Sequence, residues 1–423
     1  MAFSLPHLPK ARSRLYTRLD GYLRILWESL TGHRLKGEED LAKWVEALCG
    51  QIGSPYGVDM PMARVGIYAA VQALIRPGQK VALSPYTIAD VINMVVCAGG
   101  VPLFVDIDRA TCNIDPSALE EALRRHPDVG AVLVTHFYGL ACDMPRIQEI
   151  CRNRGVPLIE DAAQAFGTRL AGRSVGSFGD VGIFSFGLYK GVNTFYGGLL
   201  VTPHRGLYER VREQRREWPW QPQGAFLGLV AKAVVTDVLT HPLLYGMFTF
   251  YLFRYAYQRK IAWLNKHLSF DIDPQLKTVL PEGYAVRYTP LQARLGLAQL
   301  PGVAADLAAR VRTAQRYHRG LQDIGELILP PWREDGSHGY SYYPVQYEDR
   351  EALVSFALSR GVDLAESHHK NCAALPCFAP YAGECPSAAR TARSLIYLPT
   401  YPGYDVQEVE RVIRVIRAFF GRA

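Results

Sequence analysis

The sequence predicts an α/β protein with a large domain built on a mixed, mostly parallel sheet and a smaller α+β domain at the C-terminal end. Strand-like and helix-like patterns alternate from Val65 to Thr202, as expected of a sheet covered by helices. Residues 156–159 and 181–186 are apolar runs typical of buried parallel strands. At 423 residues the chain exceeds one ordinary core, which favours two domains in one subunit.

Polar side chains follow both of these apolar runs. The first run ends in Glu160 and Asp161, and the second carries Ser185 and then Lys190 out of the sheet. Ligands of open α/β sheets bind at the carboxyl ends of the strands. We therefore expect these side chains to meet at one rim of the sheet.

A lysine and an aspartate at such a rim point to one cofactor. A desolvated lysine amine is partly deprotonated and can bond an aldehyde, which suits Lys190. A carboxylate beside a pyridine nitrogen keeps the ring protonated, so that the ring can accept electrons, which suits Asp161. Together they predict pyridoxal phosphate (PLP). Taken alone, Asp161 could be a helix N-cap and Lys190 a solvated surface lysine.

From about residue 61 to the C-terminus, the sequence resembles the DegT/DnrJ/EryC1/StrS family of sugar aminotransferases, which are PLP enzymes of the aspartate-aminotransferase fold. No single motif would suffice for this resemblance, which rests on the order of several motifs along the chain. The motifs are residues 98–108, 135–139 followed by Asp143-Met144, 158–164, 184–190, Gly197-Gly198, 283–293, 385–388 and 398–403.

The resemblance implies a role for each matching residue. Lys190 would hold the cofactor covalently and move the proton, and Asp161 would pair with the pyridinium. Gln164 would contact the ring oxygen of the cofactor and Ser185 its phosphate. Residues 283–293 would reach the active site of a second subunit, so the resemblance implies a homodimer with shared active sites.

The phosphate is expected at the start of a helix that follows residues 61–64. Free amides and the helix dipole attract anions to such an end, here beside Arg64 and Val65. Most relatives carry Gly-Thr where this chain has Ala63-Arg64, so a guanidinium would replace a hydroxyl. The alternative is that Arg64 forms a surface salt bridge. The apolar positions that predict the helix are Ile67, Ala70, Val71, Leu74 and Ile75.

Two departures from the family pattern concern the cofactor's immediate surroundings. Relatives stack an aromatic ring on the cofactor, and the matching residue here is Ile88. Either Ile88 packs on the ring or Tyr86 replaces the aromatic side chain. Tyr196 stands where relatives have an acid before the paired glycines, and the sequence offers no physical reason for it.

A third departure concerns the second subunit. The asparagine that relatives lend to the neighbouring phosphate site corresponds to Ala285, so that contact is expected to be lost. Arg287 or Arg64 could compensate for it. The three departures together indicate a divergent branch of the family.

Residues 218–267 are predicted to be an inserted helical segment, because relatives connect the flanking motifs by a much shorter stretch. The segment is apolar and aromatic with basic flanks, and its longest uncharged piece is shorter than the ~20 residues that a membrane-spanning helix needs. Two interpretations remain open. The segment lies at a membrane surface, in which case the substrate could be lipid-linked, or it is buried at the dimer contact.

The predicted organisation has three parts: a helical segment at 1–52, a large PLP-binding domain at 53–298 and a small domain at 299–423. The elements expected in the small domain are a helix at 303–321, strands near 340–347 and 394–398, and an amphipathic helix at 406–420.

Composition limits the partners. The net charge of +7 favours anionic ligands, and no nucleic-acid-binding motif occurs. Eight scattered cysteines and an N-terminus without a signal-peptide pattern predict a cytoplasmic protein, or one peripheral at the inner face of the membrane. No metal is expected, because the group His368, His369, Cys372, Cys377 and Cys385 lacks a Cys-x-x-Cys pair.

We predict a PLP-dependent aminotransferase that moves an amino group from an amino acid, with glutamate the expected donor, to a keto sugar linked to a nucleotide or a lipid. Such an enzyme would serve cell-surface polysaccharide or amino-sugar biosynthesis. Relatives with histidine at the position of Lys190 resemble dehydratases, so the lysine disfavours a sugar dehydratase or epimerase. A non-catalytic, membrane-associated scaffold or regulator of the same fold is a further alternative.

Overall fold

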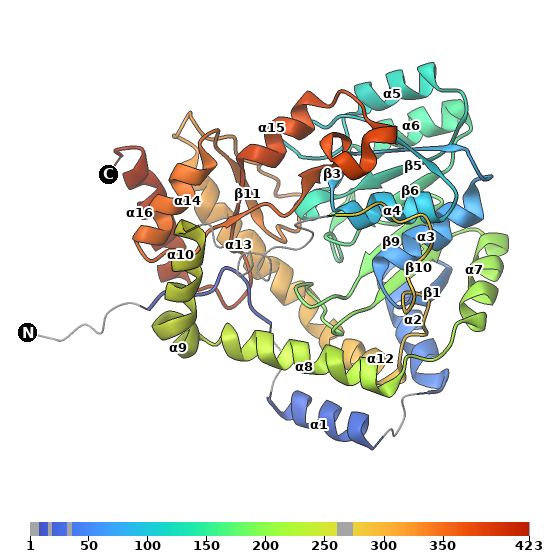
Figure 1. Ribbon diagram of the computed structural model, residues 1–423, viewed down its shortest axis with the longest axis horizontal. Coiled ribbons are helices and arrows are strands. Elements are labelled where there is room, and N and C mark those ends of the chain that lie inside the picture. Colours follow the sequence, from blue (N-terminus) through green and yellow to red (C-terminus); the bar gives the residue numbers. More distant parts are fainter. Residues whose placement is uncertain (1–7, 16–18, 32–35, 260–273, 423) are drawn as a thin grey trace, which may run out of the picture.

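A seven-stranded mixed sheet lies at the centre of the larger part of the computed structural model, which describes residues 8–15, 19–31, 36–259 and 274–422 (Figure 1). The strand order is β1-β10-β9-β6-β5-β2-β4, and the five strands from β9 to β4 are parallel. β10 is antiparallel to both of its neighbours. The α/β prediction is confirmed. The strands are β1 (Tyr56–Met60), β2 (Lys80–Leu83), β4 (Val101–Phe104), β5 (Val129–Thr135), β6 (Leu158–Asp161), β9 (Val181–Ser185) and β10 (Gly198–Thr202).

Helices cover both faces of this sheet. One face packs against α3 (Ala63–Leu74), α4 (Ala89–Cys97) and α7 (Arg205–Glu217). The other face packs against α5 (Pro116–Arg125) and α6 (Met144–Arg154), and, near β9 and β10, against α2 (Glu39–Ile52) and α12 (Pro290–Gln299). Burial on both faces explains why the strands are continuous apolar runs rather than alternating ones.

The pairing register brings the polar strand ends together. Thr135 of β5 lies opposite Asp161 of β6, and Asp161 lies opposite Ile183 of β9. On the other side of β9, Ser185 lies opposite Gly198. The carboxyl ends of β5, β6 and β9 therefore form one rim, as the sequence predicts.

A second, antiparallel sheet of order β11-β14-β12 belongs to the C-terminal part. Its core is formed with α13 (Val303–Leu321), α14 (Arg350–Ser359) and α16 (Val406–Phe419). The predictions of α13 and α16 are confirmed, whereas α14 and α15 (Pro386–Ser394) were not predicted. The strands are β11 (Tyr343–Gln346), β12 (Ala365–Glu366) and β14 (Leu395–Leu398).

Short strand pairs supplement the two sheets. β3 (Tyr86–Thr87) pairs with β13 (Lys370–Asn371), which joins the larger part of the chain to the C-terminal part, and β7 (Arg169–Leu170) pairs with β8 (Arg173–Ser174). The 3₁₀ turns are η1 (Phe137–Gly139), η3 (Leu300–Gly302), η4 (Cys372–Ala374) and η5 (Pro376–Tyr381).

The prediction that 1–52 is helical is correct for α1 (Leu19–Leu30) and α2, and wrong for residues 8–15. That stretch has no regular secondary structure, and its groups bond to the C-terminal part instead. The carbonyl of Ala11 accepts a hydrogen bond from Tyr401 at 2.9 Å, and the amide of Arg12 donates to Asp363 at 3.1 Å. Residues 1–7, 16–18 and 32–35 lie outside the described residues.

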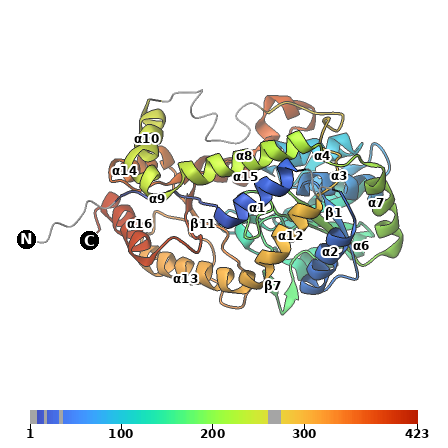
Figure 2. The same cartoon turned by 90° about the horizontal axis from the view of Figure 1, so that it is seen from below.

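Helices also form the described part of the 218–267 segment: α8 (Gln223–Leu239), α9 (Pro242–Leu244), a π-helical turn η2 (Tyr245–Thr249) and α10 (Phe250–Gln258). Residues 260–267 lie outside it. The chain bends by 58° between α8 and the helix that begins at Pro242, and α1 packs beside α8 (Figures 1 and 2). Within the described residues, no single helix is long and apolar enough to cross a membrane, but this bent pair meets that standard jointly.

Candidate active site

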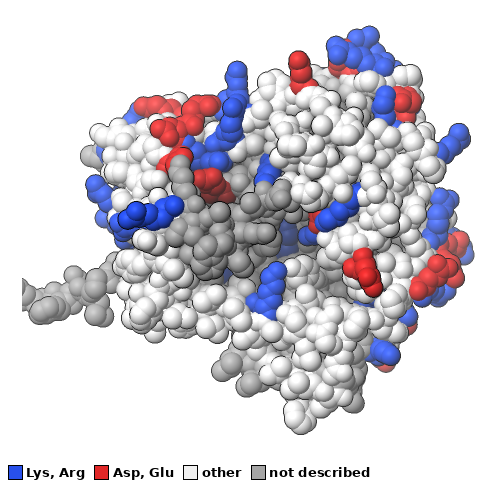
Figure 3. Space-filling model, in the orientation of Figure 1, with Lys and Arg blue, Asp and Glu red and all other residues white. Residues whose placement is uncertain are grey.

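A cavity of about 1040 Å³ lies at the rim of the large sheet and extends to the C-terminal part. Figure 3 shows this face of the molecule hollowed in the middle. Residues from the sheet, the small sheet and the 218–267 segment form its wall. Of the predicted site residues, Arg64, Ile88, Asp161, Gln164, Ser185 and Lys190 line it; Val65, Tyr86 and Arg287 do not.

Asp161 ends β6 and is 5% exposed. Its Oδ1 accepts a hydrogen bond from the amide of Ala163 at 3.0 Å, and its Oδ2 accepts a longer one from the hydroxyl of Thr135 at 3.4 Å. Burial raises the pKa of Asp161 against the opposing effects of the Ala163 amide and the nearby Lys190. The carboxylate therefore has capacity for one further strong donor on its cavity side.

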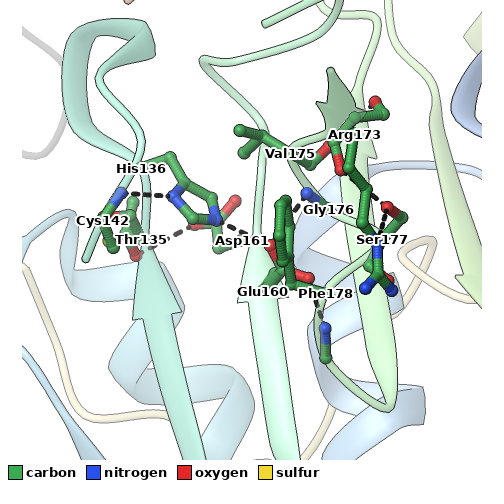
Figure 4. A network of polar contacts seen from close by, with 12 residues as sticks. Thr135, His136, Cys142, Glu160, Asp161, Arg173, Val175, Gly176, Ser177 and Phe178 are labelled. Atoms are coloured by element: carbon green, nitrogen blue, oxygen red, sulfur yellow. Dashed lines mark hydrogen bonds and ion pairs between the residues drawn. The ribbon is translucent and has the colours of Figure 1, made fainter. Parts of the chain in front are cut away.

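The neighbouring Glu160 points to the opposite side of the strand and is fully buried. Its carboxylate lies 3.1 Å from Nε2 of His136 and accepts the amides of Gly176 at 2.9 Å and Gly179 at 2.5 Å (Figure 4). Since Nδ1 of His136 accepts the amide of Cys142 at 3.0 Å, the proton of a neutral His136 is on Nε2 and is donated to Glu160. This network holds the end of β6 in place.

Lys190 follows β9 and is half-buried on the cavity wall. Burial lowers its pKa to about 8; the charge of Arg64 acts in the same direction, and Asp161 opposes both. A large fraction of the amine is therefore neutral near that pH, as bond formation with an aldehyde requires.

The predicted phosphate end of the site joins α3 to the edge of β9. The first amides of α3, on Ala63 and Arg64, have no partner within the helix. A Cβ on Gly198 would lie 2.8 Å from the nitrogen of Ala63. Gly198 therefore lets the start of α3 approach β10, opposite Ser185. Amides and a hydroxyl that converge in this way suit a phosphate.

Arg64 itself is already paired. Its guanidinium forms an ion pair with the buried Asp90 and a 3.4 Å hydrogen bond with the hydroxyl of Tyr284. Burial favours the neutral form of Asp90, but Arg64 and Lys277 outweigh it and lower its pKa. Arg64 thus combines both predicted alternatives, because it is a salt-bridge residue that also lines the cavity.

For the ring-stacking position, the structure favours Ile88 over Tyr86. Ile88 lines the cavity, whereas Tyr86 is fully buried away from it. The hydroxyl of Tyr86 bonds to the hydroxyls of Tyr138 at 2.7 Å and Ser367 at 2.9 Å. The phenol is therefore already satisfied, and of these two residues only the aliphatic Ile88 lines the cavity.

Arg287 lies away from the cavity of its own subunit. It forms an ion pair with Glu38, and its guanidinium lies 3.9 Å from the ring centre of Trp220. These partners occupy the side chain, so within one chain it does not compensate for Ala285. Val65 does not line the wall either, because the side chain of this α3 residue is fully buried.

Two histidines on the cavity wall were considered in the sequence only as metal ligands. Nδ1 of His369 lies 2.9 Å from the hydroxyl of Tyr397. Nε2 of His369 lies 3.3 Å from the side-chain amide nitrogen of Gln164. Burial lowers the pKa of both histidines, to about 4 for His368, with a smaller contribution from the charge of Lys190. Both are therefore neutral hydrogen-bonding groups; His369 orients Gln164, whereas Nδ1 of His368 lies 3.4 Å from the hydroxyl of Tyr397. Their spacing alone carries no signal for this role.

No group of three or more His, Cys, Asp or Glu side chains among the described residues is arranged to hold a metal ion.

The 218–267 segment also contributes to the cavity wall, which the sequence did not predict. Lys232 of α8 lies 3.3 Å from the hydroxyl of Tyr196, and its amine lies 5.8 Å from the centre of the Tyr196 ring. Both residues line the cavity. A tyrosine in place of the family's acid therefore has a physical role, because it packs against a lysine that the added segment supplies.

A model of the DegT/DnrJ/EryC1/StrS aminotransferase family matches residues 26–218 and 256–417. The chain belongs to this family. The sequence-based prediction of family and fold is confirmed, and the protein is a PLP-dependent aminotransferase. The family model leaves residues 219–255 unmatched, which coincides with most of the predicted insertion.

The aminotransferase is 32% identical over 305 residues to the spore coat polysaccharide biosynthesis protein SpsC of Bacillus subtilis (strain 168), covering 72% of this chain and 67% of that protein. It is similar in fold to the sugar aminotransferase CalS13 from Micromonospora echinospora, with a TM-score of 0.75, 21% identity and coverage of 96% and 99% of the two chains. The protein ntda from Bacillus subtilis, solved with bound cofactor PMP, has a TM-score of 0.73, 21% identity and coverage of 99% and 85%.

The cavity residues of this aminotransferase fit PLP. Asp161 has a carboxylate oxygen available for the pyridinium, and Lys190 presents a desolvated amine on the same wall. Ser185 and the start of α3 converge on a place for the phosphate. When bound, PLP supplies the electron-accepting ring that the chemistry requires.

Replacing Glu160 with glutamine should lower the free energy of unfolding by about 2 kcal/mol, because an amide cannot accept all three donors that the carboxylate accepts. Urea denaturation measures the change. Glu348→Gln is the matched control, since this exposed partner of Arg109 should contribute less than about 1 kcal/mol. Equal effects of the two substitutions would show that the buried network does not stabilise the fold.

The rate at which the apoenzyme combines with PLP should rise with pH to a plateau above about 8, because only the neutral amine of Lys190 reacts. Stopped-flow absorbance across pH measures this midpoint. Asp161→Asn should shift it to lower pH, since Asp161 stabilises the protonated amine. A midpoint near the ordinary lysine value of 10.5 would contradict a desolvated Lys190.

Proposed function

We propose that this aminotransferase transfers an amino group from an amino acid to a keto sugar. Glutamate is the expected amino donor. Lys190 takes and returns the proton, Asp161 holds the ring nitrogen, and Gln164 contacts the ring oxygen. Ser185 and the start of α3 at Arg64 hold the phosphate, with Ile88 against the ring. The observation that carries the proposal is that Lys190 and Asp161 share one cavity and shift each other's pKa.

The sugar part of the proposal rests on relatives. SpsC is a polysaccharide biosynthesis protein and CalS13 is a sugar aminotransferase. A cavity of about 1040 Å³ is large enough for a cofactor and a glycosyl substrate together. A role in cell-surface polysaccharide or amino-sugar biosynthesis agrees with both observations.

Lys190 also separates this function from the two alternatives. A dehydratase or epimerase of this family is expected to lack the lysine that the amino transfer uses. A scaffold without activity would not need a buried carboxylate and a desolvated amine on one wall, since both are costly to bury.

Replacing Lys190 with alanine should abolish covalent attachment of PLP and slow the conversion of PLP to pyridoxamine phosphate by glutamate by about 100-fold or more, because the proton carrier is lost. Absorbance of the cofactor during single turnover measures both effects. Lys43→Ala, an exposed lysine on α2, is the control and should behave as the wild type. An unchanged cofactor spectrum in Lys190→Ala would refute the assignment.

We further propose a homodimer with shared active sites. The motif at 283–293 carries the family's dimer contact, and Arg287 is held near the surface of the subunit by Glu38 and Trp220. Arg287 does not line the cavity of its own chain, which agrees with a role of this motif at a subunit contact.

Peripheral contact with a membrane through residues 218–267 is the third part of the proposal. In Figure 3 the surface over α8, α9 and α1 carries few charged side chains. Aromatic and apolar side chains on helices with basic flanks suit the headgroup boundary of a bilayer. The large apolar side chains exposed on this segment are Val234, Val235, Val238, Leu239, Leu243, Met247, Phe248, Tyr251, Leu252 and Tyr255, joined by Leu26, Trp27 and Leu30 of α1.

The double variant Phe248→Asp/Leu252→Asp should bind vesicles of phosphatidylcholine and phosphatidylglycerol at least about tenfold less than the wild type, because each side chain contributes about 1.5–3 kcal/mol on burial. Flotation measures the binding. Val406→Asp is the control, because Val406 is 49% exposed at the start of α16, outside the apolar surface.

Light scattering of the same proteins tests the competing interpretation. The double variant should keep the mass of the wild-type dimer, twice the 47.2 kDa of one chain. A monomeric variant, together with a wild type that ignores vesicles, would mean that a second subunit covers this surface.

A further inference from the structure

The inserted helices carry two surfaces with different neighbours. Their inner side lines the active-site cavity with Lys232, Thr236 and Leu239 of α8 and with Phe253 and Tyr257 of α10. Their outer side exposes apolar residues such as Phe248, which is 63% exposed. The segment that the family model leaves unmatched is therefore also part of the substrate-binding wall.

Leu239 connects the two surfaces. It lines the cavity and is 43% exposed, so the mouth of the cavity opens at the edge of the apolar surface. Thr236 of α8 and Thr240, which follows the last residue of α8, also line the cavity. A wholly water-soluble substrate gains nothing from an entrance of this kind, whereas a substrate with a hydrocarbon tail can keep the tail against apolar side chains while its polar end enters.

A cation stands beside this mouth. Among the other basic residues of the wall, Arg12 and Arg64 are paired with Asp363 and Asp90, and Arg310 donates to the carbonyl of Ser341 at 3.1 Å. Lys232 has no carboxylate within 4 Å in the described part of the chain; its amine contacts only the phenol of Tyr196. A cation in this position suits a phosphate that links the tail to the sugar.

Resting on the aminotransferase function proposed above, we infer that the amino acceptor is an amphiphile: a keto sugar joined through phosphate to a long hydrocarbon chain. Lys232 binds the phosphate, with Tyr196 holding its amine in place. The chain leaves the cavity past Leu239 and lies along the outer side of α8 and α10. The keto group thereby reaches Lys190 while the tail stays at the lipid surface.

Phosphate also occurs in nucleotide-linked sugars, so the test compares the two sources. Isothermal titration of the PLP-loaded enzyme with farnesyl phosphate, farnesol and thymidine diphosphate, each below its micelle-forming concentration, separates the tail from the charge. Farnesyl phosphate should bind at least about tenfold more tightly than either of the other two, because only it satisfies both the apolar mouth and Lys232. Thymidine diphosphate binding as tightly as farnesyl phosphate would overturn the inference.

Two variants localise the contacts. Lys232→Ala should weaken farnesyl phosphate about tenfold, whereas Lys43→Ala, on the exposed side of α2, should not. Leu239→Asp should weaken the binding of farnesyl phosphate and leave the binding of thymidine diphosphate unchanged. Because Leu239 is 43% exposed, this substitution should not disturb folding. Farnesyl phosphate affinity unchanged in both variants would also overturn the inference.

A parallel measurement keeps the two levels of the proposal apart. The wild-type enzyme is mixed with glutamate and the formation of pyridoxamine phosphate is followed. If this reaction proceeds and thymidine diphosphate is the better ligand, only the amphiphilic acceptor is refuted. If no amino acid converts the cofactor, the proposed function itself fails.

Discussion

The site depends on two adjacent carboxylates at the end of β6. Because side chains alternate along a strand, Glu160 and Asp161 face opposite sides, and burial makes each of them require donors. The protein satisfies Glu160 internally, with His136 and two backbone amides. It leaves Asp161 partly open towards the cavity, where the charge of Lys190 acts on it and where the proposed function places a cofactor nitrogen. One strand end thus provides both a structural anchor and a chemical group.

The glycines around this strand end have a direct steric reason. A Cβ on Gly179 would lie 2.5 Å from the carbonyl oxygen of Leu158, and one on Gly182 would lie 1.8 Å from the carbonyl oxygen of Gly176. The loop can therefore approach Glu160 closely enough for its amides to bond only if these positions lack side chains. Gly198 of β10 plays the corresponding part beside α3, because it lets the start of the helix approach β10 opposite Ser185 of β9.

The inserted helices change the other side of the cavity. They add Lys232 and apolar side chains to a wall whose remaining residues come from the N-terminal stretch, the large sheet with its helices and the C-terminal part. This arrangement relates three features to one another: the tyrosine at position 196, the inserted segment and its apolar outer surface. By contrast, no residue of the same chain is seen to compensate for Ala285 among the candidates considered, since Arg287 is held by Glu38 and Trp220.

The sequence by itself determined the α/β class and the convergence of Asp161, Ser185 and Lys190, because apolar strand runs and the polar residues that end them are local patterns. The order of motifs likewise determined the family. Only the tertiary structure decided that Ile88 rather than Tyr86 lines the cavity, that residues 8–15 are not helical, and that His369 orients Gln164. It also paired Arg64 with Asp90 and Lys232 with Tyr196. Those outcomes depend on contacts between residues distant in the chain, and neither periodicity nor spacing records which distant groups become neighbours.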